Sequence, residues 1–183
     1  MNLIRTSIVA ALLAVGANAA FAANPMVGGA PMYAKKNIIE NAVHSKDHTT
    51  LVAAVKAAGL VDTLEQPGPF TVLAPVNSAF AALPSGTVQN LLKPENKAML
   101  VKILTCHVIP AEALSSTIKK MVKSDGGVHE VKTVGGCMLK LSLKAGKIVI
   151  TDENGGMAHV TIADVKQSNG VIHVIDKVLL PKS

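Results

Sequence analysis

The last stretch of the chain, Ser168–Pro181, constrains the fold most strongly, because its sequence SNGVIHVIDKVLLP is built almost entirely of Val, Ile and Leu. Terminal residues stay ordered only when other parts of a protein hold them, and side chains this apolar favour burial. In an extended strand both faces of the segment are largely apolar, so we expect a strand covered on both sides. The segment also contains His173 and Asp176. A buried Asp176 must then accept hydrogen bonds.

The start of the chain is typical of a secretory signal peptide. Arg5 precedes an apolar run, and small residues follow it as an A-x-A cleavage site that ends at Ala22. The run is shorter than the roughly 20 residues that span a bilayer, so cleavage is favoured over a membrane anchor. We expect residues 1–22 to be removed, residues 23–34 to form a flexible leader, and residues 35–183 to form one domain in the periplasm or outside the cell.

Lysines carry the positive charge of the expected mature chain. Removing the signal removes Arg5, the only arginine, and leaves 17 lysines against 12 acidic residues, a net charge of +5. The lysines are spread along the sequence, and only Tyr33, Phe70 and Phe80 are aromatic. Nucleic-acid binders concentrate charge and use arginine or aromatic stacking, so we expect no nucleic-acid partner. Weak attraction to an anionic polysaccharide and a purely solubilising role both remain open for this charge.

Apolar periodicity separates a helical first part of the chain from a strand-rich second part. Helices are predicted at 37–43, 49–58, 77–83, 95–104 and 113–122, and strands at 70–74, 138–144, 147–151, 158–165 and from 170 onward. This order favours an antiparallel α+β domain over alternating β-α-β units.

The two cysteines, Cys106 and Cys137, are predicted to form a structural disulfide. An exported chain enters an oxidising compartment, where pairing is the default. The alternative is a reactive thiol beside His107. Adjacent residues on a strand point to opposite faces, which makes Cys106 and His107 a poor dyad and favours the disulfide.

Three stretches together resemble the signatures of the fasciclin domain family. They are FTVLAPVNSAF at Phe70–Phe80, HVIP at His107–Pro110 and NGVIHVIDKVLLP at Asn169–Pro181, and the likeness covers about residues 35–182. The resemblance implies an α+β fasciclin-like fold in which an antiparallel β wedge or sandwich packs against helices. It also implies a secreted or surface-associated adhesion module without catalysis or an obligatory cofactor.

The chain departs from the family pattern at three positions. Val76 stands where the family usually has Thr, Cys106 replaces an aromatic residue, and Ala111 replaces Gly. Val76 has no hydroxyl, so a hydrogen bond made there is lost. These departures weaken the transfer of detailed binding chemistry from the family, but not of the fold.

Polar side chains within the signatures are the candidate site residues. We expect a buried His107 that hydrogen-bonds to the first or last signature, with Asn77 and Asp176 as candidate partners. The alternative is a surface of the signatures that contacts a partner. That interaction surface would consist of Val108, Ile109, Asn169 and His173.

No pattern in the sequence supports catalysis, a metal site or a cofactor. The chain lacks a G-x-S-x-G elbow, and His44 and His48, at i, i+4 spacing, lack the Glu of H-E-x-x-H. One function then expected is adhesion to a cell-surface or matrix polysaccharide or protein. The alternative is a periplasmic carrier or envelope-stress protein that binds a small apolar ligand between helices and sheet. Salt-sensitive binding to cells would indicate adhesion. Salt-insensitive uptake of an apolar probe would indicate the carrier.

Overall fold

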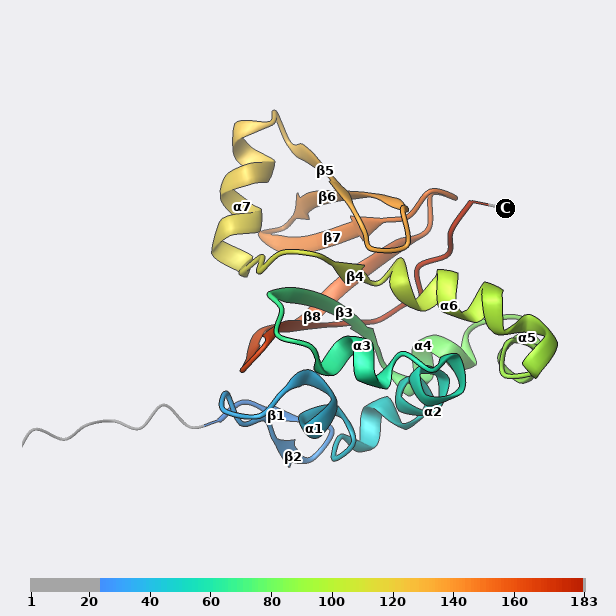
Figure 1. Ribbon diagram of the computed structural model, residues 1–183. Helices are drawn as coiled ribbons and strands as arrows, with labels where there is room; N and C mark the ends of the chain where they lie inside the picture. Colours follow the sequence, from blue (N-terminus) through green and yellow to red (C-terminus); the bar gives the residue numbers. More distant parts are fainter. Residues whose placement is uncertain (1–23, 183) are drawn as a thin grey trace, which may run out of the picture.

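The computed structural model describes residues 24–182, and the predicted signal peptide at residues 1–22 lies outside the described residues. Helices pack on both faces of one large sheet (Figure 1). The helices are α1 (Ile38–Ala42), α2 (Thr49–Ala58), α3 (Val61–Glu65), α4 (Asn77–Ala81), α5 (Thr87–Leu91), α6 (Lys97–Thr105) and α7 (Ser115–Ser124), and short 3-10 helices lie at Lys46–His48 and Pro94–Asn96. The strands are β1 (Met26–Val27), β2 (Ala30–Pro31), β3 (Phe70–Pro75), β4 (Val108–Ile109), β5 (Val128–Lys132), β6 (Met138–Lys144), β7 (Lys147–Thr151), β8 (Met157–Gln167) and β9 (Gly170–Ile175). None of the helices in residues 24–182 has the length and apolar character that crossing a membrane would need.

The large sheet is mixed, with the strand order β4-β3-β9-β8-β7-β6-β5. Its neighbouring strands run antiparallel, except that β3 and β9 run parallel. Parallel neighbours need a long connection, and the chain between β3 and β9 includes α4–α7 and β4–β8. The α+β class is confirmed, and the expectation of an antiparallel sheet is corrected at this one pair.

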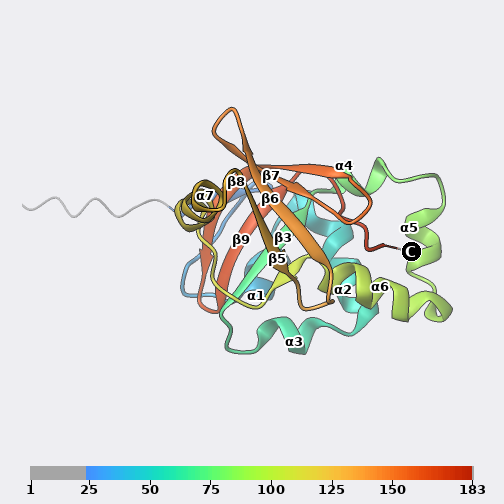
Figure 2. The same ribbon diagram turned by 90° about the horizontal axis from the view of Figure 1, so that it is seen from above.

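The interior strand β9 is buried along its whole length. On one face, Ile172 and Val174 join a first core formed with residues of α1, α2, α3 and α6. On the other face, Ile175 joins a second core formed with Ile118 and Val122 of α7. Figure 1 shows α1–α3 below this part of the sheet and α7 above it, and Figure 2 shows α7 and the α5–α6 pair at opposite ends of the view. The prediction of a terminal strand covered on both faces is therefore confirmed.

Residues 24–34, which were expected to belong to a flexible leader at residues 23–34, are folded in the structure. β1 and β2 pair as a hairpin, and Val27 and Met32 are buried in the first core. Asn41 of α1 holds the segment that follows, because its Oδ1 accepts a hydrogen bond from Tyr33 N–H at 2.9 Å and its Nδ2 donates to the Tyr33 carbonyl at 2.8 Å. The packed domain thus begins within the predicted leader.

Two helix ends follow local signals in the sequence. Asn37 caps α1, because its Oδ1 accepts a hydrogen bond from Glu40 N–H at 2.8 Å and its own N–H donates to Glu40 Oε2 at 2.7 Å. At the end of α2, Gly59 has a φ of 71°, which glycine adopts without a steric penalty. Local sequence therefore determines where α1 begins and where α2 ends.

The hairpin between β6 and β7 contains a strained residue. Its turn residues are Ala145, with a φ of 50°, and Gly146, with a φ of 77°. Left-handed backbone costs a non-glycine residue about 1–2 kcal/mol, and asparagine before glycine is favoured in such turns. We expect Ala145→Asn to raise the free energy of unfolding, measured by urea denaturation, by about 0.5–1 kcal/mol.

The matched control for this prediction is Ala57→Asn, at an exposed position of α2. The same substitution should there lower the free energy of unfolding by about 0.5 kcal/mol, because asparagine is a poorer helix former than alanine. If Ala145→Asn left the protein no more stable than the wild type, the strain assigned to Ala145 would be wrong.

Candidate functional site

The three signature stretches meet at one end of the sheet, where β3 lies between the edge strand β4 and β9 (Figure 1). The parallel register places Leu73 of β3 opposite His173 of β9. The antiparallel register places Val72 of β3 opposite Val108 of β4. Residues far apart in the sequence thus become neighbours along adjacent strands.

His107, just before β4, connects two of these stretches through the backbone. Its ring is only 3% exposed. Nδ1 lies 2.8 Å from the Ile103 carbonyl, and Nε2 accepts a hydrogen bond from the Leu179 N–H at 2.9 Å. The partner is thus the backbone of the last signature, and the expected partners Asn77 and Asp176 are corrected.

The hydrogen bonds of His107 require a neutral ring. A proton on Nδ1 satisfies the Ile103 carbonyl and leaves Nε2 free to accept from Leu179. Burial lowers the pKa of His107 to about 4, although the Ile103 carbonyl and the charge of Asp152 oppose this shift. His107 therefore acts as an uncharged support for the C-terminal segment at neutral pH.

The segment after β9 is held by side chains. The N–H of Leu180 donates to Asp152 Oδ2 at 2.9 Å, and Asn154 Nδ2 donates to the Pro181 carbonyl at 3.0 Å. The N–H of Lys182 donates to Glu153 Oε2 at 2.8 Å. The turn DENGG at the end of β7 thus supplies the groups that hold the apolar terminus in place.

The two polar residues of the C-terminal stretch differ in burial. His173 is fully buried, its Nε2 lies 2.7 Å from the Ala113 carbonyl, and its Nδ1 accepts a hydrogen bond from Asp164 N–H at 3.2 Å. Asp176 lies beyond the end of β9, and its side chain is 40% exposed. It accepts a hydrogen bond from His159 N–H at 2.7 Å. The expectation of a buried Asp176 is corrected, because the buried strand ends one residue earlier.

Asn77 caps a neighbouring helix. Its Oδ1 accepts a hydrogen bond from Thr50 N–H, in the first turn of α2, at 3.0 Å. Its Nδ2 donates to the Lys46 carbonyl at 2.8 Å. The residue is half-buried, and it stabilises the N-terminus of α2. The N-cap of α4 is Val76, which makes no side-chain bond there, in agreement with the absence of a hydroxyl.

Asn169 joins three segments in the turn before β9. Its Oδ1 accepts a hydrogen bond from Ile38 N–H at 3.0 Å, and its Nδ2 donates to the carbonyls of Leu64 at 2.7 Å and Gln66 at 3.0 Å. Substituting Asn169→Ala would leave these backbone groups without their partner. We expect a loss of about 2 kcal/mol in the free energy of unfolding, measured by chemical denaturation.

Ser168→Ala is the matched control for Asn169→Ala. Ser168 is exposed, and its N–H donates to the Lys36 carbonyl at 2.9 Å, a backbone bond that alanine retains. We expect a change within about 0.5 kcal/mol for this control. Equal stabilities of the two variants would contradict the role assigned to the Asn169 side chain.

The signatures do not form the expected interaction surface. Its four members are all buried, since the two cores cover the strands that carry them. These residues are Val108, Ile109, Asn169 and His173. These four side chains are therefore not accessible to a partner in this structure.

Cys106 and Cys137 form a disulfide, as predicted, with their Cα atoms 5.4 Å apart. Cys106 is the C-cap of α6, and Cys137 directly precedes β6, so the bond joins the two halves of the domain. Gly135 packs tightly beside it, because a Cβ at this residue would lie 2.8 Å from Cys106 N. The reactive-thiol alternative for Cys106 is thereby excluded in this state.

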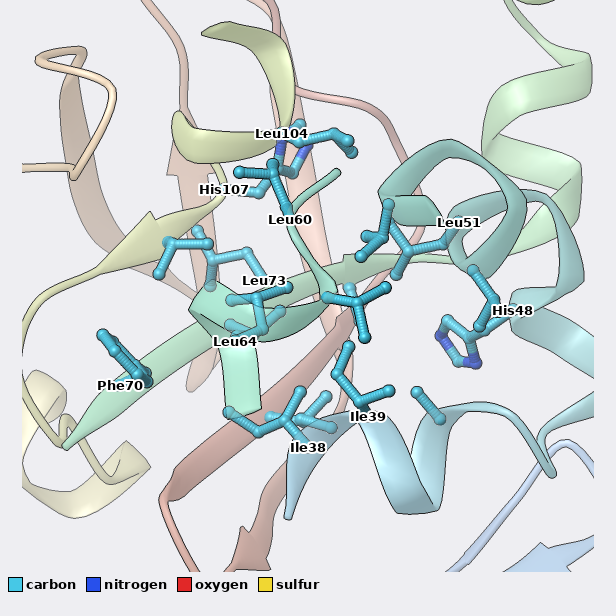
Figure 3. A pocket seen from close by; sticks show the side chains of 18 of the residues that line it. Ile38, Ile39, His48, Leu51, Leu60, Leu64, Phe70, Leu73, Leu104 and His107 are labelled. Atoms are coloured by element: carbon cyan, nitrogen blue, oxygen red, sulfur yellow. The ribbon is translucent and has the colours of Figure 1, made fainter. Parts of the chain in front are cut away.

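A cavity of about 70 Å³ lies between the N-terminal helices and the sheet (Figure 3). Its walls come from α1, α2, the region of α3, β3 and the end of α6, and most of the lining side chains are apolar. Figure 3 shows Ile38, Leu51, Leu64, Phe70 and Leu104 around this space. An apolar cavity can stay dry and admit an apolar molecule.

His48 gives the cavity wall an unsatisfied polar atom. The side chain is 3% exposed, and Nδ1 lies 2.8 Å from Ser45 Oγ. Among the described residues, no group meets hydrogen-bond geometry with Nε2, although the Ala74 carbonyl is close enough to act on the ring. Burial lowers the pKa of His48, and the Ala74 carbonyl and the charge of Asp47 offset only part of this effect. The sequence offered only the His44–His48 spacing, which does not reveal a buried imidazole beside a cavity.

The sequence of the chain is similar to those of known proteins over most of the folded region. The model of the Fasciclin domain family matches residues 46–181. Protein sll1483 of Synechocystis is 49% identical over 144 residues, which cover 79% of this chain and 73% of that protein. Transforming growth factor-beta-induced protein ig-h3 of Sus scrofa is 37% identical over 131 residues, which cover 72% of this chain and 17% of that protein.

A solved structure shares the fold. It is a FAS1 domain pair from the insect cell adhesion molecule Fasciclin I, 20% identical in sequence, with a TM-score of 0.71. The match covers 79% of this chain and 51% of that chain.

Proposed function

The chain belongs to the fasciclin domain family, and on this basis we propose that it is an exported, non-enzymatic module that attaches cells to one another or to an extracellular matrix. The observation that carries the proposal is the fold shared with a domain pair of an insect cell adhesion molecule. The described polar residues of the signatures support it, because Asn77, His107, Asn169 and His173 all hold backbone groups of the domain. These side chains serve the fold, which leaves the outer surface for binding.

The partner that we propose is a polysaccharide or protein of the cell surface or matrix, with the module in the periplasm or released from the cell. A genetic experiment tests the role. Cells that lack the protein should be retained less well on a matrix-coated surface under flow, and added purified protein, beginning at residue 23, should restore retention. Unchanged retention in the deletion strain would contradict an adhesive role.

A second candidate function, the carriage of a small apolar ligand, is favoured by the cavity beside His48. The cavity has about half the 150 Å³ of an engineered apolar cavity that admits benzene. By the same ratio it suits a ligand of about three non-hydrogen atoms. The free Nε2 of His48 would pair with one hydroxyl on such a ligand.

The probe for this candidate is ethanol, an alcohol with three non-hydrogen atoms. We expect it to shift the nuclear magnetic resonance signals of residues around the cavity in a saturable manner that added salt does not weaken. Ala42→Leu adds volume at the cavity wall and should abolish the shifts. Ala53→Leu, at an exposed position of the neighbouring helix, is the matched control and should leave them unchanged. Equal responses of both variants would exclude this cavity as the site.

A further inference from the structure

The positive charge of the domain is concentrated in residues 115–147, which we call the basic lobe. These residues form α7, β5, β6 and the first residue of β7. They contain seven lysines and two acidic residues, Asp125 and Glu130, and so carry a net charge of +5. The other described residues contain ten lysines and ten acidic residues and are neutral overall. The expectation that the lysines are scattered without a concentrated charge is thus corrected.

The basic lobe is one structural unit. Ile118 and Val122 of α7 pack against Leu139 and Leu141 of β6 within the second core. Figure 1 shows α7, β5 and β6 together at the top of the molecule, away from α1–α3. All seven lysines of the lobe are exposed, so they form a charged shell around this core.

Several of these lysines have an explanation within the fold. Lys123 lies in the last turn of α7, where a positive charge is favoured. Lys140 Nζ lies 3.7 Å from Oε1 of Glu130 on the neighbouring strand. Lys132 lies on β5, one of the two edge strands of the large sheet, where lysine opposes edge-to-edge aggregation.

Lys144 and Lys147 have no such explanation. They are directly opposite each other across β6 and β7, and like charges in this position destabilise a sheet. Among the described residues neither lysine is in an ion pair, and both acidic residues of the lobe are engaged, Asp125 with His129 and Glu130 with Lys140. The fold thus keeps a repulsive pair that a negatively charged ligand would relieve.

The lysines of β5, β6 and β7 share the sheet face that is turned away from α7. Along β6, Lys140 lies between the buried Leu139 and Leu141, so its side chain is on the opposite, exposed face. Lys132 of β5 pairs with the exposed Met138 of β6, which lies on the same face as Lys140. At about 3.3 Å per residue, β6 extends this charged face over about 20 Å.

We propose that this face and the β6–β7 hairpin bind an acidic polysaccharide, an inference that rests on the proposed adhesive function.

The composition of the basic lobe favours a polysaccharide over other polyanions. Residues 115–147 contain no arginine and no aromatic residue, the groups that nucleic-acid binders use for forked hydrogen bonds and base stacking. Peripheral membrane proteins add Trp, Phe or Leu that insert among the lipids, and the exposed large apolar residues of the lobe are Val128, Val134 and Met138. Lysines act as separate point charges, which suits carboxylates spaced along a glycan.

The experiment measures equilibrium binding of the protein, from residue 23, to beads that carry alginate, a carboxylate polysaccharide, or neutral dextran. We expect binding to alginate alone, and we expect it to weaken steeply as salt is added. A variant with Lys132→Gln, Lys144→Gln and Lys147→Gln should bind alginate about tenfold or more weakly at low salt.

The matched control carries Lys93→Gln, Lys97→Gln and Lys102→Gln, which removes the same charge from exposed positions near and on α6. We expect it to retain nearly all alginate binding. Thermal unfolding of both variants, followed by circular dichroism, checks that they fold. Equal weakening of the two variants would overturn the site, because only net charge would then matter.

Two further outcomes separate this inference from the adhesive function. Suppose that the wild type binds its own cells, and that the variant with Lys132→Gln, Lys144→Gln and Lys147→Gln binds cells and alginate as well as the wild type does. The inference is then overturned, and the adhesive function stands. If the wild type binds neither alginate nor cells, both fail. Binding to vesicles of anionic phosphatidylglycerol without binding to alginate would also overturn the polysaccharide and point to a membrane surface.

Discussion

Lowering the pH from 7 to 4 is expected to reduce the free energy of unfolding by about 3 kcal/mol through His107 alone. Burial lowers the pKa of this side chain from 6.5 to about 4 in the folded protein. Between these values the unfolded chain binds more protons than the folded one, so stability is fully present above pH 6.5 and is lost as the pH falls toward 4. Protonation of Nε2 also removes the acceptor of the Leu179 N–H.

Two other histidines also lower the free energy of unfolding in acid, and two carboxylates titrate in a different pH range. Burial also lowers the pKa of His48 and of His173, so both add to the acid destabilisation. Hydrogen bonds lower the pKa of Asp125 and of Glu153, whose usual values are already near 4, so these carboxylates titrate below the range of His107.

Urea denaturation at a series of pH values measures this effect, with His107→Ala as the comparison. That variant loses the bond to Leu179 and should be less stable by about 1–3 kcal/mol at pH 7. Its stability should fall less steeply between pH 6.5 and 4, since the group with the largest shift is gone. Parallel pH profiles of the two proteins would contradict the role of His107.

Removing the disulfide should lower the free energy of unfolding by about 3–4 kcal/mol. The bond closes a loop between residues separated by 31 positions, and it restricts the unfolded chain. Cys106→Ala with Cys137→Ala is the suitable variant, because both sites are buried and a serine hydroxyl would need a partner there. The measurement is denaturation of the oxidised wild type, the reduced wild type and the double variant.

The reducing agent provides the control. It should destabilise the wild type and leave the double variant unchanged. Because Cys106 adjoins His107, we also expect the disulfide and His107 substitutions to be non-additive when combined. A loss below about 1 kcal/mol on reduction would contradict a stabilising disulfide.

Periodicity predicted the parts of the fold whose faces differ in polarity. The alternation in Met138–Lys144 identified β6, and the apolar spacing after Thr49 identified α2, because each pattern reports which side is buried. The parallel pairing of β3 with β9 could not be read in this way, since periodicity does not name a strand's neighbour. The β1–β2 hairpin was missed because its two-residue strands are too short to show a period.

The candidate sites differ in how far sequence could reveal them. Fasciclin-like signatures identified His107 and Asn169, but their partners are backbone groups, which a sequence does not distinguish. The unpaired Nε2 of His48 arises only from tertiary packing. The basic lobe could have been found by counting charges within windows, although the opposition of Lys144 and Lys147 required the register of the hairpin.

Equilibrium binding of the labelled protein, from residue 23, to the cells that produce it tests the adhesive function most directly. Folded protein should bind saturably, and the binding should weaken as salt is added and disappear when the protein is reduced and unfolded by heat. Equal binding of folded and unfolded protein, or no saturable binding, would contradict the adhesive function.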